Sequence, residues 1–190
     1  MYEIRIHGRG GQGAVLAAKI LAKALVEEGK FAKAIPSFGF ERRGAPVSAF
    51  LRFDDKEIRQ STNIYNPDCI VCIDPTLPRA VDIFSGMNRN GIWVQATKKT
   101  LKDLKVPETV AKVGLCDAFG IALQVFGRVI TNSIMLGALA KTTGMVSMGN
   151  LCKAMESVAF RDAALDKNIQ AIQKGFEETK VYEIRKEEAL

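Results

Sequence analysis

The sequence predicts an α/β fold: a mostly parallel sheet with an antiparallel hairpin and a helical C-terminal extension, formed by residues 1–190 as a single domain. Three observations predict it. The chain opens with a strand-like segment, a glycine cluster and a helix rich in Ala and Leu. Short apolar runs without alternation follow, as expected of parallel strands covered on both faces. The C-terminal part consists of helix-like segments separated by breaks that contain glycine.

The first elements are a strand, a turn and a helix. Residues 2–7 alternate between polar and apolar and end in a glycine cluster over residues 8–13. Residues 14–28 form a predicted helix that Gly29 closes, because Gly is favoured just beyond a helix end. Residues 31–35 supply a second strand, which Pro36 stops. This order is the opening of a βαβ unit.

A hairpin is predicted next. A polar, glycine-containing loop over residues 37–45 leads into residues 47–53, where every second side chain is apolar. Residues 54–56 read Asp-Asp-Lys, which is a turn signal, and residues 57–60 are expected to return as the partner strand.

The central strands are predicted over residues 69–73 and 92–96, connected by a helix that begins near Pro78 and covers residues 77–84. Residues 110–113 are expected to add one more strand. Cys69 and Cys72 have CxxC spacing, but residues three apart on a strand point to opposite faces. We therefore interpret them as small buried side chains rather than as a metal or disulfide pair.

The C-terminal extension is expected to pack on the sheet and to supply contacts to other subunits. Its predicted helices cover residues 119–126, 133–141, 151–158 and 168–176.

Composition excludes several classes of function. The formal net charge is +6, with 25% charged and 47% hydrophobic residues, which is ordinary for a globular protein. The basic residues lack the interleaved aromatics or reading helix of nucleic-acid binders, so we expect no nucleic acid and instead an anionic small molecule or an acidic partner. The local cluster of Lys98, Lys99, Lys102 and Lys105 is expected to be a solvated face.

No apolar run approaches the ~18 residues that a membrane span needs, and no signal peptide is apparent at the N-terminus. The four cysteines do not form the C-x2-C-x2-C run of an iron–sulfur site. We expect a cytoplasmic protein with reduced thiols, not associated with a membrane.

The glycine cluster has the spacing Gly8-x-Gly10-x-x-Gly13 and lies between a predicted strand and a predicted helix. This context defines a Rossmann-like phosphate-binding turn, where backbone N–H groups and the helix N-terminus attract a pyrophosphate, and Arg9 could add a charged hydrogen bond. The alternative is a plain tight turn. A dehydrogenase would also carry an acidic residue at the end of the second strand. The first acid is Glu41, inside a loop, which argues against an ordinary dehydrogenase.

Arg42 and Arg43 are a second candidate feature for anion binding. Arginine binds phosphate or carboxylate through two parallel hydrogen bonds, and this pair lies in a loop just beyond the second strand. The alternative is that both pair with Glu41 or with acids on another subunit.

Three further polar residues have simpler interpretations. Asn132 is expected to be a helix N-cap, with Thr131 as the alternative cap and a ligand contact as the lesser possibility. His7, at the end of the first strand, is expected to be structural, although it is near enough to the turn to touch a phosphate.

Together, these segments resemble a known family. Residues 4–13 (Ile-Arg-Ile-His-Gly-Arg-Gly-Gly-Gln-Gly), residues 36–47 (Pro-Ser-Phe-Gly-Phe-Glu-Arg-Arg-Gly-Ala-Pro-Val) and the following hairpin are similar to the gamma subunit of the 2-oxoacid:ferredoxin oxidoreductases, with the pyruvate enzyme the most similar. The segment 132–139 also fits, and the resemblance covers most of the chain.

The resemblance implies an enzyme complex that oxidatively decarboxylates a 2-oxoacid with coenzyme A, giving acyl-CoA, CO2 and two electrons for ferredoxin. It implies thiamine diphosphate, Mg2+ and iron–sulfur clusters on alpha, beta and delta partner subunits. The chain has neither the Gly-Asp-Gly of a thiamine-enzyme magnesium motif nor a cluster-forming cysteine array, so we expect it not to catalyse the reaction alone. For this subunit the resemblance implies support of assembly and coenzyme A binding, carried over onto Gly8, Arg9, Gly10, Gly11, Gln12, Gly13, Arg42 and Arg43.

Three hypotheses remain open at this point. The chain is a non-catalytic subunit that shapes a coenzyme A site, a stand-alone nucleotide-dependent enzyme, or a scaffold whose turn holds no ligand. The 2-oxoacid is also open among pyruvate, 2-oxoisovalerate and others.

Overall fold

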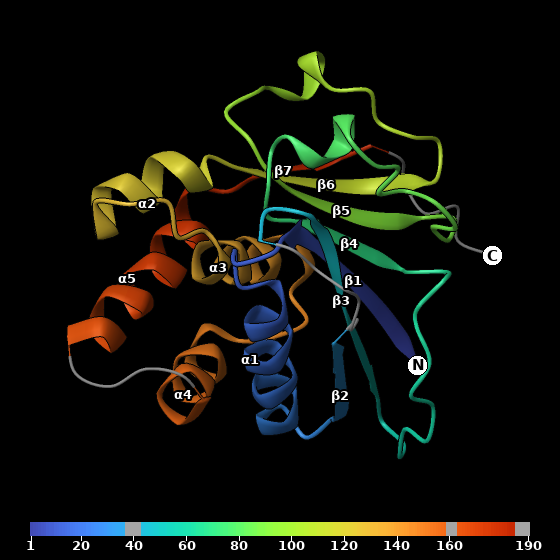
Figure 1. The fold of residues 1–190 in the computed structure, drawn as a ribbon. Coiled ribbons are helices and arrows are strands. Elements are labelled where there is room, and N and C mark those ends of the chain that lie inside the picture. Colours follow the sequence, from blue (N-terminus) through green and yellow to red (C-terminus); the bar gives the residue numbers. More distant parts are fainter. Residues whose placement is uncertain (37–42, 159–162, 185–190) are drawn as a thin grey trace.

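The computed structural model describes residues 1–36, 43–158 and 163–184. Within them the chain forms one mixed sheet with helices packed against it (Figure 1). The strands are β1 (Tyr2–Arg9), β2 (Phe31–Pro36), β3 (Pro46–Asp54), β4 (Cys69–Cys72), β5 (Gly91–Ala96), β6 (Val110–Cys116) and β7 (Lys180–Glu183). The helices are α1 (Ala14–Glu27), α2 (Ala118–Phe126), α3 (Asn132–Thr143), α4 (Met148–Val158) and α5 (Ala163–Glu178).

The sheet has the order β2-β3-β1-β4-β5-β6-β7. β1, β4, β5 and β6 pair in parallel, whereas β3 is antiparallel to both β1 and β2, and β7 is antiparallel to β6. β2 therefore runs in the same direction as β1. The predicted Rossmann-like α/β fold with a mostly parallel sheet is confirmed, and β7 is a strand that sequence reasoning missed.

The predicted hairpin exists, but its expected partner strand is wrong. β3 pairs with β2 from Phe31↔Asp54 to Pro36↔Ala49, and on its other side with β1. Residues 57–60 form no strand. The reason is that β3 lies inside the sheet with both edges already paired, so no ladder position is left for the segment that follows it.

The predicted helix over residues 77–84 is also wrong. Only a single 3-10 turn forms, over Leu77–Arg79, and the rest of the crossover is irregular. The buried Arg5 guanidinium on β1 donates hydrogen bonds to the carbonyl oxygens of Ile83 (2.9 Å) and Ser85 (2.7 Å). A helix would use such carbonyls internally, so this long-range anchoring replaces the local pattern.

The two faces of the sheet are covered differently. The helices α1–α5 lie on one face (Figure 1), where they share an apolar core with residues such as Ile6, Val71 and Val94. The other face is covered by the irregular crossovers, whose Leu77 and Ile83 pack against strand residues including Trp93. The helical extension therefore packs on the sheet as predicted, and α3 lies at its centre, with ten of its twelve residues buried.

Two smaller expectations are also confirmed. Cys69 belongs to the core on the helical face and Cys72 to the core on the other face, and both thiols are free. The side chains of the Lys98–Lys105 cluster are all exposed. Among the described residues, no helix is both long and apolar enough to cross a membrane.

Candidate functional site

The glycine turn joins β1 to α1. β1 extends to Arg9, and the turn closes through a hydrogen bond from the Gln12 N–H to the Arg9 carbonyl oxygen (3.0 Å). The Gly10 N–H donates to the carbonyl of Ala45 (2.9 Å), and the Gly44 N–H donates to the carbonyl of Gly10 (3.1 Å). Gly44 and Ala45, just before β3, therefore stabilise the conformation of the turn through backbone hydrogen bonds.

α1 starts with an uncapped N-terminus. Gly13 is the N-cap residue with φ of 83°, no side chain accepts a hydrogen bond from the first turn, and that turn contains no acidic residue. A Cβ on Gly13 would lie 2.7 Å from Asn132 Nδ2, so both the backbone angle and the close approach of α3 require glycine here. The first N–H groups of α1 thus face outward without a side-chain partner, which is the arrangement that attracts an anion.

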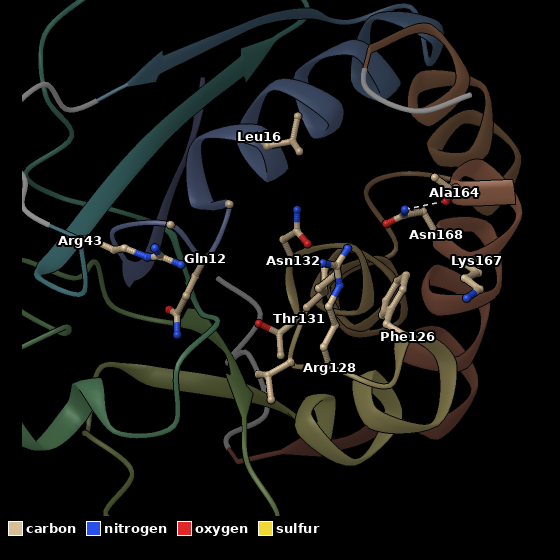
Figure 2. Close-up of a pocket in the computed structure, with 14 residues that line it drawn as sticks. Gln12, Leu16, Arg43, Phe126, Arg128, Thr131, Asn132, Ala164, Lys167 and Asn168 are labelled. Carbon is tan, nitrogen blue, oxygen red and sulfur yellow. Dashed lines mark hydrogen bonds between the residues drawn. The ribbon is translucent and has the colours of Figure 1, made fainter. Parts of the chain in front are cut away.

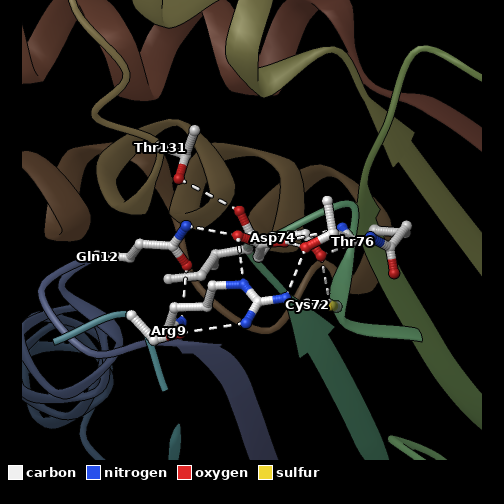
Figure 3. Close-up of polar contacts among 9 residues, drawn as sticks. Arg9, Gln12, Cys72, Asp74, Thr76 and Thr131 are labelled. Atoms are coloured by element: carbon white, nitrogen blue, oxygen red, sulfur yellow. Dashed lines mark hydrogen bonds and ion pairs between the residues drawn. The ribbon is translucent and has the colours of Figure 1, made fainter. Parts of the chain in front are cut away.

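The polar side chains of the turn are tied to Asp74, which follows β4 (Figure 3). Gln12 Oε1 accepts from the Arg9 N–H (2.7 Å), and Gln12 Nε2 donates to Asp74 Oδ2 (2.6 Å). Arg9 Nε lies 3.4 Å from the same carboxylate oxygen, while the Arg9 guanidinium also donates to the Gly44 carbonyl (3.1 Å) and to the Thr76 hydroxyl (2.8 Å). Arg9 and Gln12 therefore brace the turn in this structure.

Asp74 is a buried carboxylate held in its charged form. Burial alone would raise its pKa, but hydrogen bonds from Thr76 and Gln12, together with the Arg9 charge, outweigh burial and lower the pKa below its usual value. The network lies just beyond the ends of β1 and β4, the point from which the chain crosses to opposite sides of the sheet. In doubly wound folds the crevice at this point receives the ligand.

A pocket of about 720 Å³ opens instead on the helical side of the turn (Figure 2). Its walls come from the glycine turn, the start of α1, the end of α2, the segment between α2 and α3, and the first turns of α5. A volume in this range suits a nucleotide-sized ligand. Gly11, Gln12, Gly13 and Arg43 are the residues expected from the sequence that line it.

The pocket is lined by positive charge. Arg43, Arg128 and Lys167 contribute to its walls, and none of its fourteen lining residues is Asp or Glu. Within the described part of the chain, no hydrogen bond or ion pair engages these three cations. By contrast, Lys30 and Lys174, elsewhere on the surface, each pair with a carboxylate. Unpaired cations of this kind favour an anionic ligand.

Asn132 lies at the base of the pocket, where α3 begins. It is the first residue of α3 and 4% exposed, and Thr131 occupies the N-cap position without a side-chain capping hydrogen bond. The expectation for Asn132 is therefore wrong, because it lies inside the helix. Thr131 takes the N-cap position, as the alternative expected, but its hydroxyl donates to the Ile73 carbonyl (3.3 Å) and does not accept a hydrogen bond from the first turn of α3. Asn132 Oδ1 is buried without any hydrogen-bond partner. A buried amide oxygen without a partner is costly, and a ligand N–H would satisfy it.

The remaining expected residues lie around this pocket or outside the described residues. Gly8 is buried at the end of β1, and Gly10 lines a shallower depression beside the N-terminus of α1. Arg42 lies outside the described residues. Sequence reasoning missed Asp74, Arg128 and Lys167. Asp74 had a signal, because it closely follows the central strand β4. The other two had none, because the segment after α2 and the helix α5 are distant in the sequence from the glycine turn.

His7 is structural, as expected. Arg5 Nε, which can only donate, lies 3.0 Å from His7 Nε2, so the other ring nitrogen carries the proton and faces the Ser48 hydroxyl at 3.3 Å. Burial, together with the Arg5 charge, lowers the pKa of His7 to about 4.

Within the described residues, the cysteines are not grouped with other metal-binding side chains. All four are free, and burial raises the pKa of each thiol above its ordinary value. Across residues 1–36, 43–158 and 163–184, no three His, Cys, Asp or Glu side chains are grouped so as to hold a metal ion.

The fold and the site define the class of this protein: a Rossmann-like α/β chain with a cation-lined pocket at the N-terminus of its first helix. Residues 3–178 match the protein family described as pyruvate ferredoxin/flavodoxin oxidoreductase. The chain belongs to this family, as a gamma subunit of a multi-subunit 2-oxoacid oxidoreductase.

Three relatives illustrate the likeness. The chain is 59% identical, over 100% of both chains, to the gamma subunit of an NADH-dependent phenylglyoxylate dehydrogenase from Aromatoleum evansii. It is 48% identical, over 97% of this chain and 100% of the other, to the common gamma subunit of the pyruvate/ketoisovalerate oxidoreductases of Thermococcus kodakarensis. The crystal structure of pyruvate oxidoreductase subunit PORC from Thermotoga maritima superimposes with a TM-score of 0.83 at 39% identity, over 96% of this chain and 98% of that one.

Proposed function

We propose that this gamma subunit binds coenzyme A for its complex, holding the phosphates of the nucleotide in the pocket between the glycine turn, α2, α3 and α5. The observation that carries the proposal is the combination, among the residues that the structure describes, of three unpaired cations with a lining free of acidic side chains in one pocket of about 720 Å³. Coenzyme A carries a diphosphate and a separate ribose phosphate, so its charge complements this lining.

Two helix N-termini add to the attraction. α1 begins at Ala14 and α3 at Asn132, and neither has a side-chain cap on its first turn. Each helix N-terminus carries a partial positive charge of about half an elementary charge, with N–H groups free to bind phosphate oxygens. Both helices begin at this pocket, so their fields add to the charges of Arg43, Arg128 and Lys167.

The stand-alone dehydrogenase is the weaker alternative. In a dinucleotide-binding fold the strand beside β1 carries the acid that holds the adenosine ribose. Here β3 separates β2 from β1, and it runs antiparallel to both. The end of β2 is therefore displaced by one strand from the glycine turn.

We propose that the carbon and redox chemistry take place on partner chains. Thiamine diphosphate with Mg2+ would supply the decarboxylation, and iron–sulfur clusters on the alpha, beta or delta subunits would carry two electrons to ferredoxin. The positions of Cys69 and Cys72 support this division, because they belong to the cores on opposite faces of the sheet and do not face one common cluster. We place the complex in the cytoplasm, where such thiols stay reduced.

Pyruvate is the first candidate substrate, as in the names of the Thermococcus and Thermotoga relatives. The second is an aryl 2-oxoacid such as phenylglyoxylate, with NAD as the final electron acceptor, which the 59% identity to the Aromatoleum chain favours. Assaying the native complex with pyruvate, 2-oxoisovalerate and phenylglyoxylate, each with a viologen dye and with NAD, distinguishes them. The preferred acid gives the highest kcat/KM.

The coenzyme A proposal is tested by Arg43→Ala in the assembled complex. Loss of a charged hydrogen bond to a phosphate raises the KM for coenzyme A by about tenfold or more, while the KM for the 2-oxoacid stays the same. The matched control is Lys23→Ala on α1, an exposed cation that lines neither this pocket nor the depression beside the N-terminus of α1, and which leaves both KM values unchanged. An unchanged KM for coenzyme A in the Arg43 variant contradicts the proposal.

A further inference from the structure

We infer that Arg128 and Lys167 form a second anion subsite, separate from that of the glycine turn and Arg43, and that this subsite selects coenzyme A by its 3′-phosphate. The inference rests on the proposed function and assigns a specificity role to two residues that no sequence motif indicates. It predicts discrimination against dephospho-coenzyme A, which carries the same diphosphate but lacks the ribose phosphate.

The two subsites lie on different sides of the pocket. In Figure 2, Arg43 lies beside Gln12 on one side of Asn132, whereas Arg128 lies directly beside Asn132 and Lys167 lies on the other side, beyond Phe126. Arg43 precedes β3, Arg128 follows α2, and Lys167 is in the second turn of α5. Because Arg43 and Lys167 lie at opposite sides of the pocket, we assign them to different phosphate groups of the ligand, with Arg128 on the side of Lys167.

The backbone conformation at the end of α2 places Arg128 in the lining of the pocket. Gly127 ends α2 in the left-handed conformation, with φ of 67°, and its N–H donates to the Leu123 carbonyl (3.0 Å). This C-cap turns the chain out of α2 toward the N-terminus of α3, so Arg128 enters the pocket lining with the residues of the connecting segment.

The position of Lys167 is fixed by the packing of α5 against α3. Its neighbour Asn168 is 4% exposed; its Oδ1 accepts a hydrogen bond from the Ser133 hydroxyl (2.5 Å), and its Nδ2 donates to the Ala164 carbonyl (2.7 Å). Lys167 therefore projects from a helix turn that is anchored next to Asn132, rather than from a free surface. Lys174, two turns further along α5, instead pairs with Glu178 and does not line the pocket.

A ligand with two separated anionic groups satisfies this arrangement. The diphosphate lies at the glycine turn, the N-terminus of α1 and Arg43, and the 3′-phosphate lies at Arg128 and Lys167. Between them, the unpartnered Asn132 Oδ1 is an acceptor for an N–H group of the adenine.

The test is the ratio of kcat/KM for coenzyme A to that for dephospho-coenzyme A, measured on the assembled complex. We expect the unmodified complex to prefer coenzyme A by about tenfold or more, since a phosphate bound by two cations contributes at least one charged hydrogen bond. In the Arg128→Ala/Lys167→Ala variant the ratio falls to near 1. Both side chains are exposed, so neither change removes core packing.

Two further variants complete the experiment. Lys174→Ala, on the same helix, keeps the ratio of the unmodified complex. Arg43→Ala raises the KM for both ligands and also keeps the ratio. A double variant that retains the full preference overturns the second subsite. If Arg43→Ala also leaves the KM for coenzyme A unchanged, the proposed function itself fails, so the two failures are distinguishable.

Discussion

Asp74 determines what the polar side chains of the glycine turn can do. Sequence reasoning assigned Arg9 and Gln12 to ligand binding because both lie within the motif. In the folded chain both are hydrogen-bonded or ion-paired to Asp74, together with Thr76 (Figure 3). A direct role for Arg9 or Gln12 in binding stays a prediction, and it would require this network to open.

Replacing Asp74 with Asn tests the bracing role. The amide keeps the shape but loses the charge that Arg9 faces in a buried setting, so we expect the free energy of unfolding to fall by about 1–3 kcal/mol. The control is Asp55→Asn, whose exposed carboxylate pairs with Lys30, and which should change stability by less than about 1 kcal/mol. Urea unfolding of the full chain measures both. Equal effects of the two variants contradict the bracing role.

His7 makes stability depend on pH. Its pKa is about 4 in the folded chain and 6.5 for an ordinary histidine, so the unfolded state binds a proton first as the pH falls. Stability from this group is fully present above pH 6.5 and is lost between pH 6.5 and about 4, at about 1.4 kcal/mol per pH unit.

We expect His7→Asn to flatten the pH dependence over this range. Denaturant unfolding at pH 7, 6 and 5 measures the difference. The same slope in both proteins would show that another group is responsible.

At the scale of elements, the periodicity of apolar residues correctly predicted most of the helices and central strands, because their local sequence determines them. The strands β1, β4, β5 and β6 and the helices α1–α5 were expected within a few residues of their observed bounds. Two predicted elements, at residues 57–60 and 77–84, were wrong, and strand β7 was missed. The two wrong predictions result from contacts that no local pattern contains. One is the double pairing of β3, and the other is the guanidinium of Arg5 reaching across to Ile83 and Ser85.

The crossing of α3 and α5 is the element-scale contact on which the pocket wall depends. Gly137 on α3 faces the backbone of α5, and a Cβ there would overlap the Ile172 carbonyl oxygen. We expect Gly137→Ala to push the helices apart and to destabilise the chain by about 2 kcal/mol.

Gly149 on α4 is the matched control, because a Cβ there meets nothing within 4 Å. Alanine at this position should leave stability unchanged or raise it by up to about 1 kcal/mol. Thermal unfolding of the two variants provides the comparison. A Gly137 variant as stable as the Gly149 variant would contradict the close packing.

For the whole molecule, the site was only partly predictable. The glycine turn is a contiguous motif, and Arg43 lies near it in the sequence, so both could be found by inspection. Arg128 and Lys167 reach the same pocket only because α2, α3 and α5 pack against one another beside the glycine turn (Figures 1 and 2). Such convergence depends on tertiary packing and carries no local signal.

The activity of the whole molecule is also expected to depend on its partner subunits. We expect the purified chain alone to reduce no viologen dye with any 2-oxoacid and coenzyme A, and to gain this activity only after reassembly with the partner subunits. Turnover by the isolated chain would contradict the division of chemistry between subunits.

Hydrogen exchange in the assembled complex tests the central claim most directly. Exchange of the backbone N–H groups over residues 11–16, at the turn and the start of α1, is compared with and without coenzyme A. Phosphate oxygens that accept hydrogen bonds from these groups should slow their exchange, with a smaller effect at the start of α3. If coenzyme A, at concentrations that saturate turnover, changes exchange neither over residues 11–16 nor at the start of α3, binding at this turn is contradicted.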